Sequence, residues 1–128
     1  MQRSRCIPAF FIENKLLMNT ERYFRVLGRV QGVMFRQTFI RAAQKRGLTG
    51  AATNLPDGSV SCFLSGSEGQ INEILEGLRS GREINSWGAR VEQLIPLDPA
   101  EGLAFEKHQV TTANVDAFNW SPDVKMHL

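Results

Sequence analysis

The sequence has few of the residues that would indicate a metal site, a disulfide framework or a membrane span. Its 128 residues include two cysteines and two histidines, and none of these stands at a spacing typical of metal ligands. The apolar run from Ile7 to Ile12 is far shorter than the ~20 residues that a helix needs to cross a bilayer. No Gly-Lys-Ser or Gly-Lys-Thr completes a Walker loop. We therefore expect neither a disulfide scaffold, nor a membrane protein, nor a P-loop nucleotide-binding enzyme.

The sequence also lacks a large excess of positive or negative charge. Fifteen basic residues stand against thirteen acidic ones, which gives a formal net charge of +2. This balance does not require nucleic acid or an anionic membrane as a partner, so recognition of an anion must depend on a local group of residues. Hydrophobic residues make up 42% of the chain, enough for one ordinary core. Cys62, in an apparent strand, is interpreted as a small core residue of a cytoplasmic protein.

The hydrophobic pattern predicts strands and helices in the order β-α-β-β-α-β, followed by a short extra strand. The strands are expected over Tyr23–Leu27, Leu48–Asn54, Ser59–Ser65, Ser86–Leu97 and about Leu103–Val110. One helix is expected over about Val33–Arg46 and another from near Glu68 to near Ser80. Right-handed crossovers would place both helices on one face of an antiparallel sheet. The predicted fold class is therefore α+β, a ferredoxin-like βαββαβ sandwich.

The most informative stretch lies where the first strand gives way to the first helix, and it reads GRVQGVMFR from Gly28 to Arg36. Its two glycines permit backbone conformations with positive φ and a close approach of a ligand. The free N–H groups of the turn and of the first helical turn can converge on one point, where the helix dipole adds partial positive charge. Arg36 can bind two phosphate oxygens with paired hydrogen bonds. The stretch therefore predicts a site for a phosphate group.

These nine residues resemble the signature loop of the acylphosphatase family, Gly-x-Val-Gln-Gly-Val-x-Phe-Arg. A second stretch, GAATN from Gly50 to Asn54 followed by a Pro-Asp-Gly turn, is similar to the family's other motif, Gly-Trp-Val-x-Asn. The two motifs stand in the family's order and at its separation, and the resemblance covers roughly residues 22–110. It implies the ferredoxin-like fold and the hydrolysis of small acyl phosphates, with no cofactor and no metal.

The resemblance also implies roles for single residues. Arg36 and the backbone N–H groups of the loop would hold the phosphoryl group, and Asn54 would orient the attacking water. The loop residues concerned are Gln31, Gly32, Val33, Met34, Phe35 and Arg36. The carboxyl–phosphate bond has a good leaving group, so its hydrolysis depends on positioning and charge stabilisation more than on a side-chain nucleophile.

The boundaries follow from the same reading. Residues 1–20 are expected to be a flexible N-terminal extension, residues 21–110 an acylphosphatase-like domain, and residues 111–128 a C-terminal tail without clear periodicity. The substrate would be a small molecule, and we expect a monomer that needs neither nucleic acid nor a membrane.

One departure from the family pattern leaves an alternative open. Ala51 and Ala52 stand where the family usually has Trp and Val, and this loss of bulk predicts a displaced Asn54 and reduced activity, unless Phe24 or Trp87 fills the space. The alternative is a weak or inactive module that binds an anion or a partner without turnover. Similar domains also occur at the N-terminus of large hydrogenase-maturation proteins, but this sequence lacks the zinc-finger cysteines of those proteins, which favours the hydrolase.

Overall fold

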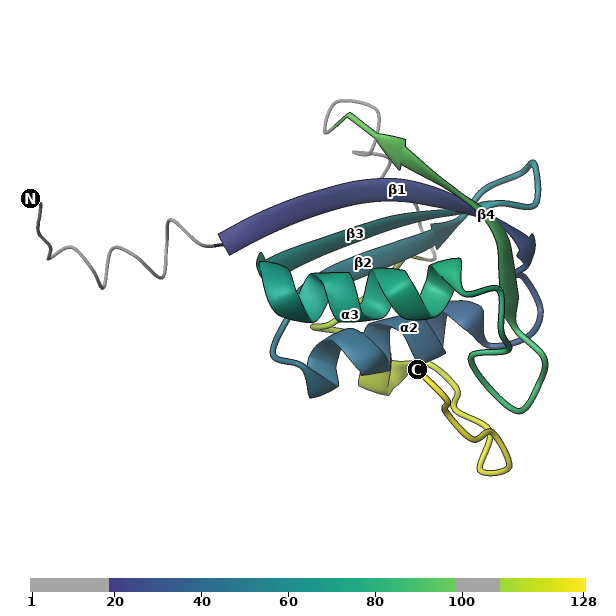
Figure 1. Cartoon of the computed structure of the whole chain (residues 1–128). Helices are drawn as coiled ribbons and strands as arrows, with labels where there is room; N and C mark the ends of the chain where they lie inside the picture. Colours follow the sequence, from purple (N-terminus) through teal and green to yellow (C-terminus); the bar gives the residue numbers. More distant parts are fainter. Residues whose placement is uncertain (1–18, 99–108) are drawn as a thin grey trace, which may run out of the picture.

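A computed structural model describes residues 19–98 and 109–128, and in it an antiparallel sheet lies over two helices (Figure 1). The strands are β1 (Asn19–Arg29), β2 (Thr49–Asn54), β3 (Val60–Ser67), β4 (Arg90–Leu97) and β5 (Val110–Thr111). The helices are α2 (Phe35–Lys45), α3 (Glu68–Arg79) and the short 3-10 helix η1 (Val115–Ala117). Residues 1–18 and 99–108 lie outside the described residues, and with them most of the predicted N-terminal extension.

The strand order in the sheet is β4-β1-β3-β2-β5, and every paired strand is antiparallel to its neighbour. Both long helices cover the same face of the sheet (Figure 1), which confirms the predicted ferredoxin-like sandwich. The extra strand of the prediction is also present, because Val110 begins β5 and pairs with Ala52 of β2. The rest of that predicted strand, residues 103–108, is outside the described part of the chain.

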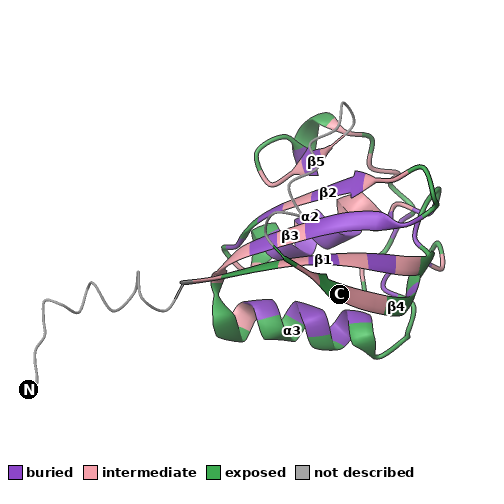
Figure 2. Ribbon diagram, turned by 90° about the horizontal axis from the view of Figure 1, so that it is seen from above, coloured by how far each residue is buried: buried purple, intermediate pink, exposed green. Residues whose placement is uncertain are grey.

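The core fills the space between sheet and helices, and apolar spacing explains how α2 contributes to it. Phe35, Phe39, Ala42 and Ala43, the residues that predicted this helix, are all buried. Phe39 packs edge-to-face on Phe24 of β1, with ring centroids 5.9 Å apart. Figure 2 shows buried and exposed positions alternating along α3 in the same amphipathic manner. Helix spacing thus fixes which side of each helix meets the sheet.

The turn between β2 and β3 is closed by hydrogen bonds around its proline-aspartate-glycine sequence. The Leu55 amide donates to the Ser59 carbonyl at 2.9 Å, and Asp57 Oδ1 accepts from both the amide and the hydroxyl of Ser59. These bonds lower the pKa of the Asp57 carboxyl. Arg25 adds an ion pair of 2.9 Å to Asp57. The turn at the end of the strand that carries Asn54 is therefore held in one conformation.

The strand predicted over Ser86–Leu97 is shorter than expected, since β4 begins only at Arg90. Asn85 is the reason, because its Oδ1 accepts hydrogen bonds from the amides of Trp87 and Ala89 at 3.0 and 3.1 Å. These bonds fold residues 85–89 into a turn, in which Gly88 has a φ of +84°. Trp87 thus lies in a turn and not in the sheet.

The segment predicted as a C-terminal tail packs against the domain. Val115, Val124 and Leu128 are buried, and a Cβ placed on Gly77 of α3 would lie 2.7 Å from Leu128 Cδ1. An isolated antiparallel bridge pairs Asn85 with Met126. The absence of regular periodicity therefore reflects irregular backbone and not a lack of contacts.

Residues 19–98 and 109–128 contain no helix that is both long and apolar enough to cross a membrane.

Candidate active site

The loop between β1 and α2 has the backbone conformations that its glycines predict. Gly28 and Gly32 have φ values of +134° and +76°. Met34, at the N-cap of α2, has a φ of +60°, and among the described residues no other side-chain-bearing residue has a positive φ. Such left-handed backbone is unfavourable for a residue with a Cβ and is concentrated at functional sites. The loop is therefore bent tightly just before the helix begins.

The N-terminus of α2 is left open for an anion. The first backbone hydrogen bond recorded there runs from the Thr38 amide to the Met34 carbonyl, at 3.0 Å. The N-cap makes no side-chain hydrogen bond, and the first turn contains no acidic residue. The partial positive charge of the helix N-terminus is therefore not compensated by a carboxylate of that turn. An oxyanion is the natural ligand for such a helix end.

A pocket of about 280 Å³ lies at this helix end and brings the two sequence motifs together. Arg36 of the first motif and Asn54 of the second both line it. Among the residues that the structure describes, the lining consists of Val30, Gly32, Met34, Phe35, Arg36, Gln37, Asn54, Trp87 and Asn119. Of the loop residues predicted to bind phosphate, Gly32, Met34, Phe35 and Arg36 therefore face the pocket, whereas Gln31 and Val33 do not.

Asn54 presents an unused acceptor. Its side-chain Oδ1 is buried and, within the described part of the chain, has no hydrogen-bond partner. A buried polar atom without a partner costs free energy, so such atoms in folded proteins usually have a partner in protein, ligand or ordered water. An atom of this kind in a pocket suits a water molecule or a ligand hydroxyl as hydrogen-bond donor.

Arg36 supplies the positive charge of the pocket, and partial burial lowers the pKa of its guanidinium. A guanidinium remains protonated in proteins despite such a shift. Partial removal from water also strengthens its attraction for a bound anion, because less solvent screens the charge. Arg36 therefore contributes a cation to the lining of the helix-end pocket.

Gln31 connects the two motifs through its side chain. Its Nε2 donates hydrogen bonds of 2.9 Å to the carbonyl oxygens of Leu55 and Ser59, which flank the turn after Asn54. The sequence predicted only a backbone role for Gln31. The structure adds a tie that holds the phosphate loop and the Asn54 strand end at a fixed separation.

Asn85 fixes the other side of the loop and was missed by the sequence reasoning. The residue is fully buried, and its Nδ2 donates to the Val33 carbonyl and to Thr38 Oγ1, both at 2.9 Å. Its Oδ1 accepts the two amides of the Trp87 turn described above. All the hydrogen-bonding capacity of this amide is used, so the loop, the first turn of α2 and the Trp87 turn are joined in one network.

Four lining residues, Val30, Gln37, Trp87 and Asn119, were not predicted as site residues. Trp87 was expected in a strand and Asn119 in a tail, so neither pattern pointed to the site. Asn119 reaches the pocket because its carbonyl accepts a hydrogen bond of 3.3 Å from Gln37 Nε2. A signal did exist for Trp87, since a tryptophan beside a glycine between a helix and a strand is unusual in a simple connection.

The two residues that replace the family's Trp and Val differ in their surroundings. Ala52 is fully buried and lies in register with Cys62 and Val110, whereas Ala51 is half-buried. Of the two residues considered as fillers, Phe24 lies in the core, and Trp87 is 37% exposed at the pocket.

Fold and site together define an α+β protein with a pocket at a helix N-terminus, lined by Arg36 and Asn54. A family model described as acylphosphatase matches residues 22–97. An acylphosphatase of Paraburkholderia xenovorans is 48% identical over 59 residues, which cover 46% of this chain and 61% of that relative. The matched stretch thus spans about three fifths of the length of that curated relative.

Solved structures of acylphosphatases match a larger share of this chain. The crystal structure of acylphosphatase from Bacillus subtilis superimposes with a TM-score of 0.54 and 30% identity, covering 71% of this chain and 92% of that one. An acylphosphatase from Coxiella burnetii gives a TM-score of 0.55 and 29% identity, covering 66% and 86% of the two chains. The chain belongs to the acylphosphatase family.

Proposed function

We propose that the protein hydrolyses the carboxyl–phosphate bond of small acyl phosphates, without a metal, by direct attack of water. Family membership supports the reaction class. The observation that carries the proposal is that Asn54, whose Oδ1 has no hydrogen-bond partner among the described residues, lines the same pocket as Arg36 at the open end of α2. A water acceptor, a cation and an anion-binding helix end are the groups that this reaction needs.

In the proposed reaction the phosphoryl group occupies the pocket at the N-terminus of α2. Backbone N–H groups of the loop and the guanidinium of Arg36 bind its oxygens and stabilise the charge spread over them in the transition state. The donors are held in place beforehand by the Gln31 and Asn85 hydrogen bonds, so little reorganisation is required when the substrate reacts.

Asn54 would hold the attacking water through its Oδ1. The water oxygen forms a bond to phosphorus while the bond from phosphorus to the carboxyl oxygen breaks, so the products are inorganic phosphate and a carboxylate. The proton released by the water passes to the phosphate. An amide group can perform this positioning without ionising, which agrees with a pocket in which Arg36 is the one titratable residue among the lining residues.

The test is steady-state hydrolysis of acetyl phosphate by the wild type, Arg36→Ala, Asn54→Ala and a control, Arg79→Ala. Arg79 is exposed on α3 and lies outside the pocket. On the precedent of removed oxyanion donors, Arg36→Ala should lose about a thousandfold in turnover. Asn54→Ala should lose about a hundredfold, because the water is no longer aligned. Wild-type turnover in a folded Arg36→Ala protein would remove Arg36 from the reaction.

A second candidate, an anion-binding module without turnover, is favoured by Ala51 and Ala52, which leave less bulk beside Asn54 than the family pattern. Inorganic phosphate distinguishes the two functions. In both cases phosphate should raise the melting temperature of the wild type but not that of Arg36→Ala, since a ligand stabilises the state that binds it. Phosphate binding without hydrolysis of acetyl phosphate would establish the module.

We also propose that residues 21–110 form the catalytic domain, completed by the C-terminal segment that carries Asn119, and that the protein acts as a monomer in the cytoplasm. A monomer suffices for the proposed reaction, because Arg36 and Asn54 line one pocket of a single chain. The support for a reducing compartment is a free, buried thiol at Cys62. Size-exclusion chromatography with light scattering tests the first statement, and a dimer at micromolar concentration would contradict it.

A further inference from the structure

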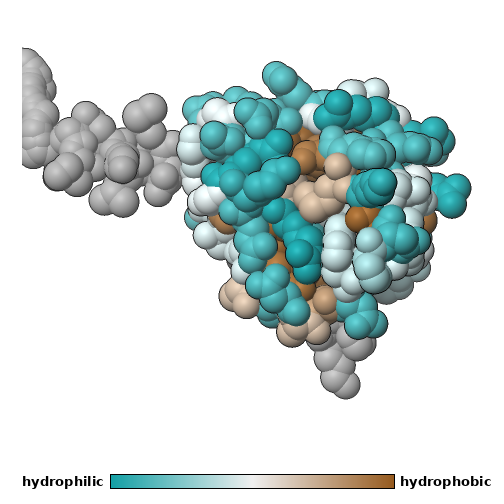
Figure 3. Space-filling view, turned by 90° about the horizontal axis from the view of Figure 1, so that it is seen from below, coloured by the Kyte–Doolittle hydropathy of each residue, from teal (hydrophilic) through white to brown (hydrophobic). Residues whose placement is uncertain are grey.

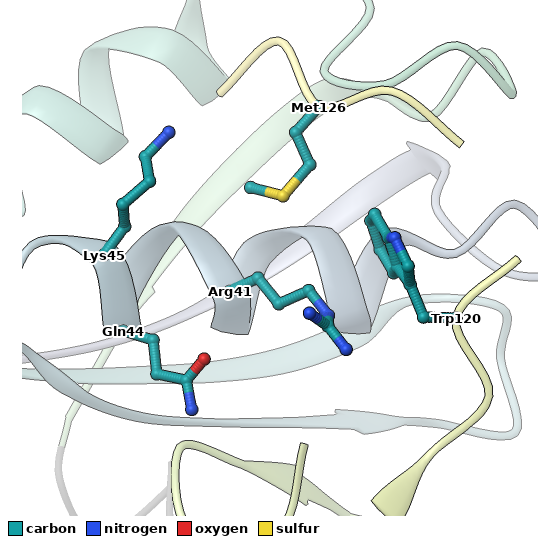
Figure 4. Close-up of a pocket in the computed structure, with 5 residues that line it drawn as sticks. All are labelled: Arg41, Gln44, Lys45, Trp120 and Met126. Atoms are coloured by element: carbon teal, nitrogen blue, oxygen red, sulfur yellow. The ribbon is translucent and has the colours of Figure 1, made fainter. Parts of the chain in front are cut away.

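A second pocket, of about 390 Å³, lies beside α2 and has no role in the reaction proposed above. Figure 4 shows three side chains projecting from α2 and two from the C-terminal segment that runs beside it. The lining residues are Arg41, Gln44 and Lys45 from the helix and Trp120 and Met126 from the segment. The pocket therefore combines two cations and an amide with an aromatic and an aliphatic wall.

Arg41 has donor capacity left for an anion. Its Nε is buried and has no hydrogen-bond partner among the residues that the structure describes. The nearest carboxylate, of Asp116, is a long 3.9 Å from Nη2, and its side chain is 79% exposed. The guanidinium Cζ lies 4.6 Å from the centroid of the Trp120 ring, which holds it in place. None of the five lining residues is acidic, and the nearby carboxylate of Asp116 is exposed to solvent, which weakens its repulsion of a second carboxylate.

This second pocket continues the helix-end pocket along one face of α2. Gln37, Arg41, Gln44 and Lys45 follow one another at intervals of four, three and one, which places them on one side of the helix. Gln37 lines the first pocket and Arg41 the second. The facing wall is continuous as well, because Asn119 lines the first pocket and Trp120 the second. Figure 3 views this helix side of the molecule, where hydrophobic atoms are visible between the hydrophilic side chains.

The second pocket lies next to the site of the proposed reaction along α2. Water and the leaving group lie on opposite sides of the phosphorus atom in an in-line displacement. The carboxylate therefore leaves on the side of the phosphorus atom away from the water that Asn54 would hold. Gln37 of the first pocket and Arg41 of the second lie four residues apart, about one helical turn or ~6 Å along the helix axis. A four-carbon dicarboxylic chain is long enough to cover that separation.

We propose that Arg41, Lys45 and Trp120 form a subsite for the acyl group, selecting acyl phosphates whose chain ends in a carboxylate. This inference rests on the proposed hydrolase function. The distal carboxylate binds Arg41 and Lys45, and the methylene groups of the chain lie on Trp120 and Met126. The subsite uses residues 120 and 126, which lie beyond the stretch of residues 22–97 matched by the family model.

The experiment compares succinyl phosphate with butyryl phosphate, which has the same four-carbon length but no distal carboxylate. Acetyl phosphate reports hydrolysis that needs no subsite. We expect kcat/KM for succinyl phosphate to exceed that for butyryl phosphate by about tenfold, the effect of one charge-assisted hydrogen bond at a partly exposed site. Arg41→Met and Lys45→Met should each reduce this ratio, and the double variant should bring it close to one. Arg79→Met, which removes an exposed charge from α3, should keep the wild-type ratio.

The ratio is measured within one protein, so a variant that folds poorly lowers both rates and leaves the ratio unchanged. Equal kcat/KM values for the two substrates in the wild type, with acetyl phosphate hydrolysed, would overturn the subsite and leave the hydrolase standing. A wild-type preference that survives in the double variant would also overturn it. No turnover of any of the three substrates would overturn the proposed function, and the subsite with it.

Discussion

The side-chain amide of Asn85 donates a hydrogen bond of 2.9 Å to the backbone carbonyl of Val33, so a residue that follows α3 fixes the loop that precedes α2. The two residues are 52 positions apart in the sequence. Asn85 is fully buried between the loop that contains Val33 and the Trp87 turn. The bend of the phosphate loop therefore depends on a distant amide as well as on its own glycines.

Asn85→Ala should lower the free energy of unfolding by about 2–4 kcal/mol, because two buried acceptors and two backbone donors lose their partner. The turnover of acetyl phosphate should fall as well, since the loop is released. Urea unfolding and steady-state rates measure the two effects. Asn114→Ala is the control, because Asn114 is exposed and bonds within its own turn. Equal stability losses in the two variants would contradict the importance of Asn85.

Gln31→Met should separate binding from turnover. The substitution keeps the length of the side chain but removes the hydrogen bonds to the Leu55 and Ser59 carbonyls, so the strand end with Asn54 is no longer tied to the loop. We expect kcat to fall about tenfold, the order of loss that small misplacements cause. The affinity for inorganic phosphate, measured by competitive inhibition, should stay within about twofold. A large loss of phosphate affinity with normal kcat would contradict this role.

Gly28 and Gly32 form a matched pair with different expected costs. A Cβ on Gly28 would lie 2.7 Å from the Arg90 carbonyl oxygen and 2.7 Å from the Glu92 amide nitrogen, whereas one on Gly32 would meet nothing within 4 Å. Gly28→Ala should therefore destabilise the protein by more than about 3 kcal/mol, because backbone atoms must move. Gly32→Ala should cost about 1 kcal/mol, from its positive φ alone. Urea denaturation measures the free energy of unfolding of both variants. Equal losses of stability would show that the backbone near Gly28 moves enough to accommodate the added methyl group.

The pH dependence of hydrolysis should follow the substrate. Arg36 is the one ionisable residue among those that line the helix-end pocket, and it stays protonated although burial lowers its pKa. Between about pH 5 and 8, kcat/KM should therefore change only with ionisation of the substrate phosphate. Profiles for acetyl phosphate and for a substrate with a different phosphate pKa should shift by the difference between those values. If kcat/KM changed at the same pH for both substrates, an ionisable group of the protein would be responsible, which would contradict this prediction.

Because the Cys62 thiol is buried, we expect the free energy of unfolding to fall at alkaline pH. Burial raises the pKa of its thiol well above the ordinary value of 9.0. The folded state then keeps the proton where the unfolded state releases it, so stability is complete below the unfolded pKa and falls as the pH rises beyond it. Unfolding free energies from pH 7 to about 10 should fall more steeply for the wild type than for Cys62→Ala. Parallel curves would contradict a titrating thiol.

The sequence predicted the sandwich and its helices because apolar residues recur along single elements, as Phe35 and Phe39 do in α2. It predicted that Arg36 and Asn54 belong to one site only because their two motifs resemble those of the acylphosphatase family. It did not predict Asn85 or Asn119, because their contacts join segments that are far apart in the chain and follow no local period. The 85–89 turn was mistaken for strand for the same reason, since the side-chain oxygen of Asn85 overrides the local preference for extended backbone.

The C-terminal segment gives the pocket a dependence on the order of synthesis. The helix end and the Asn54 strand leave the ribosome before Asn119 and Met126, the partner of Asn85. A nascent chain can therefore form most of the sheet while one wall of its pocket is still missing. The complete pocket thus forms only after a segment translated well behind Arg36 and Asn54 has packed against the sheet and helices.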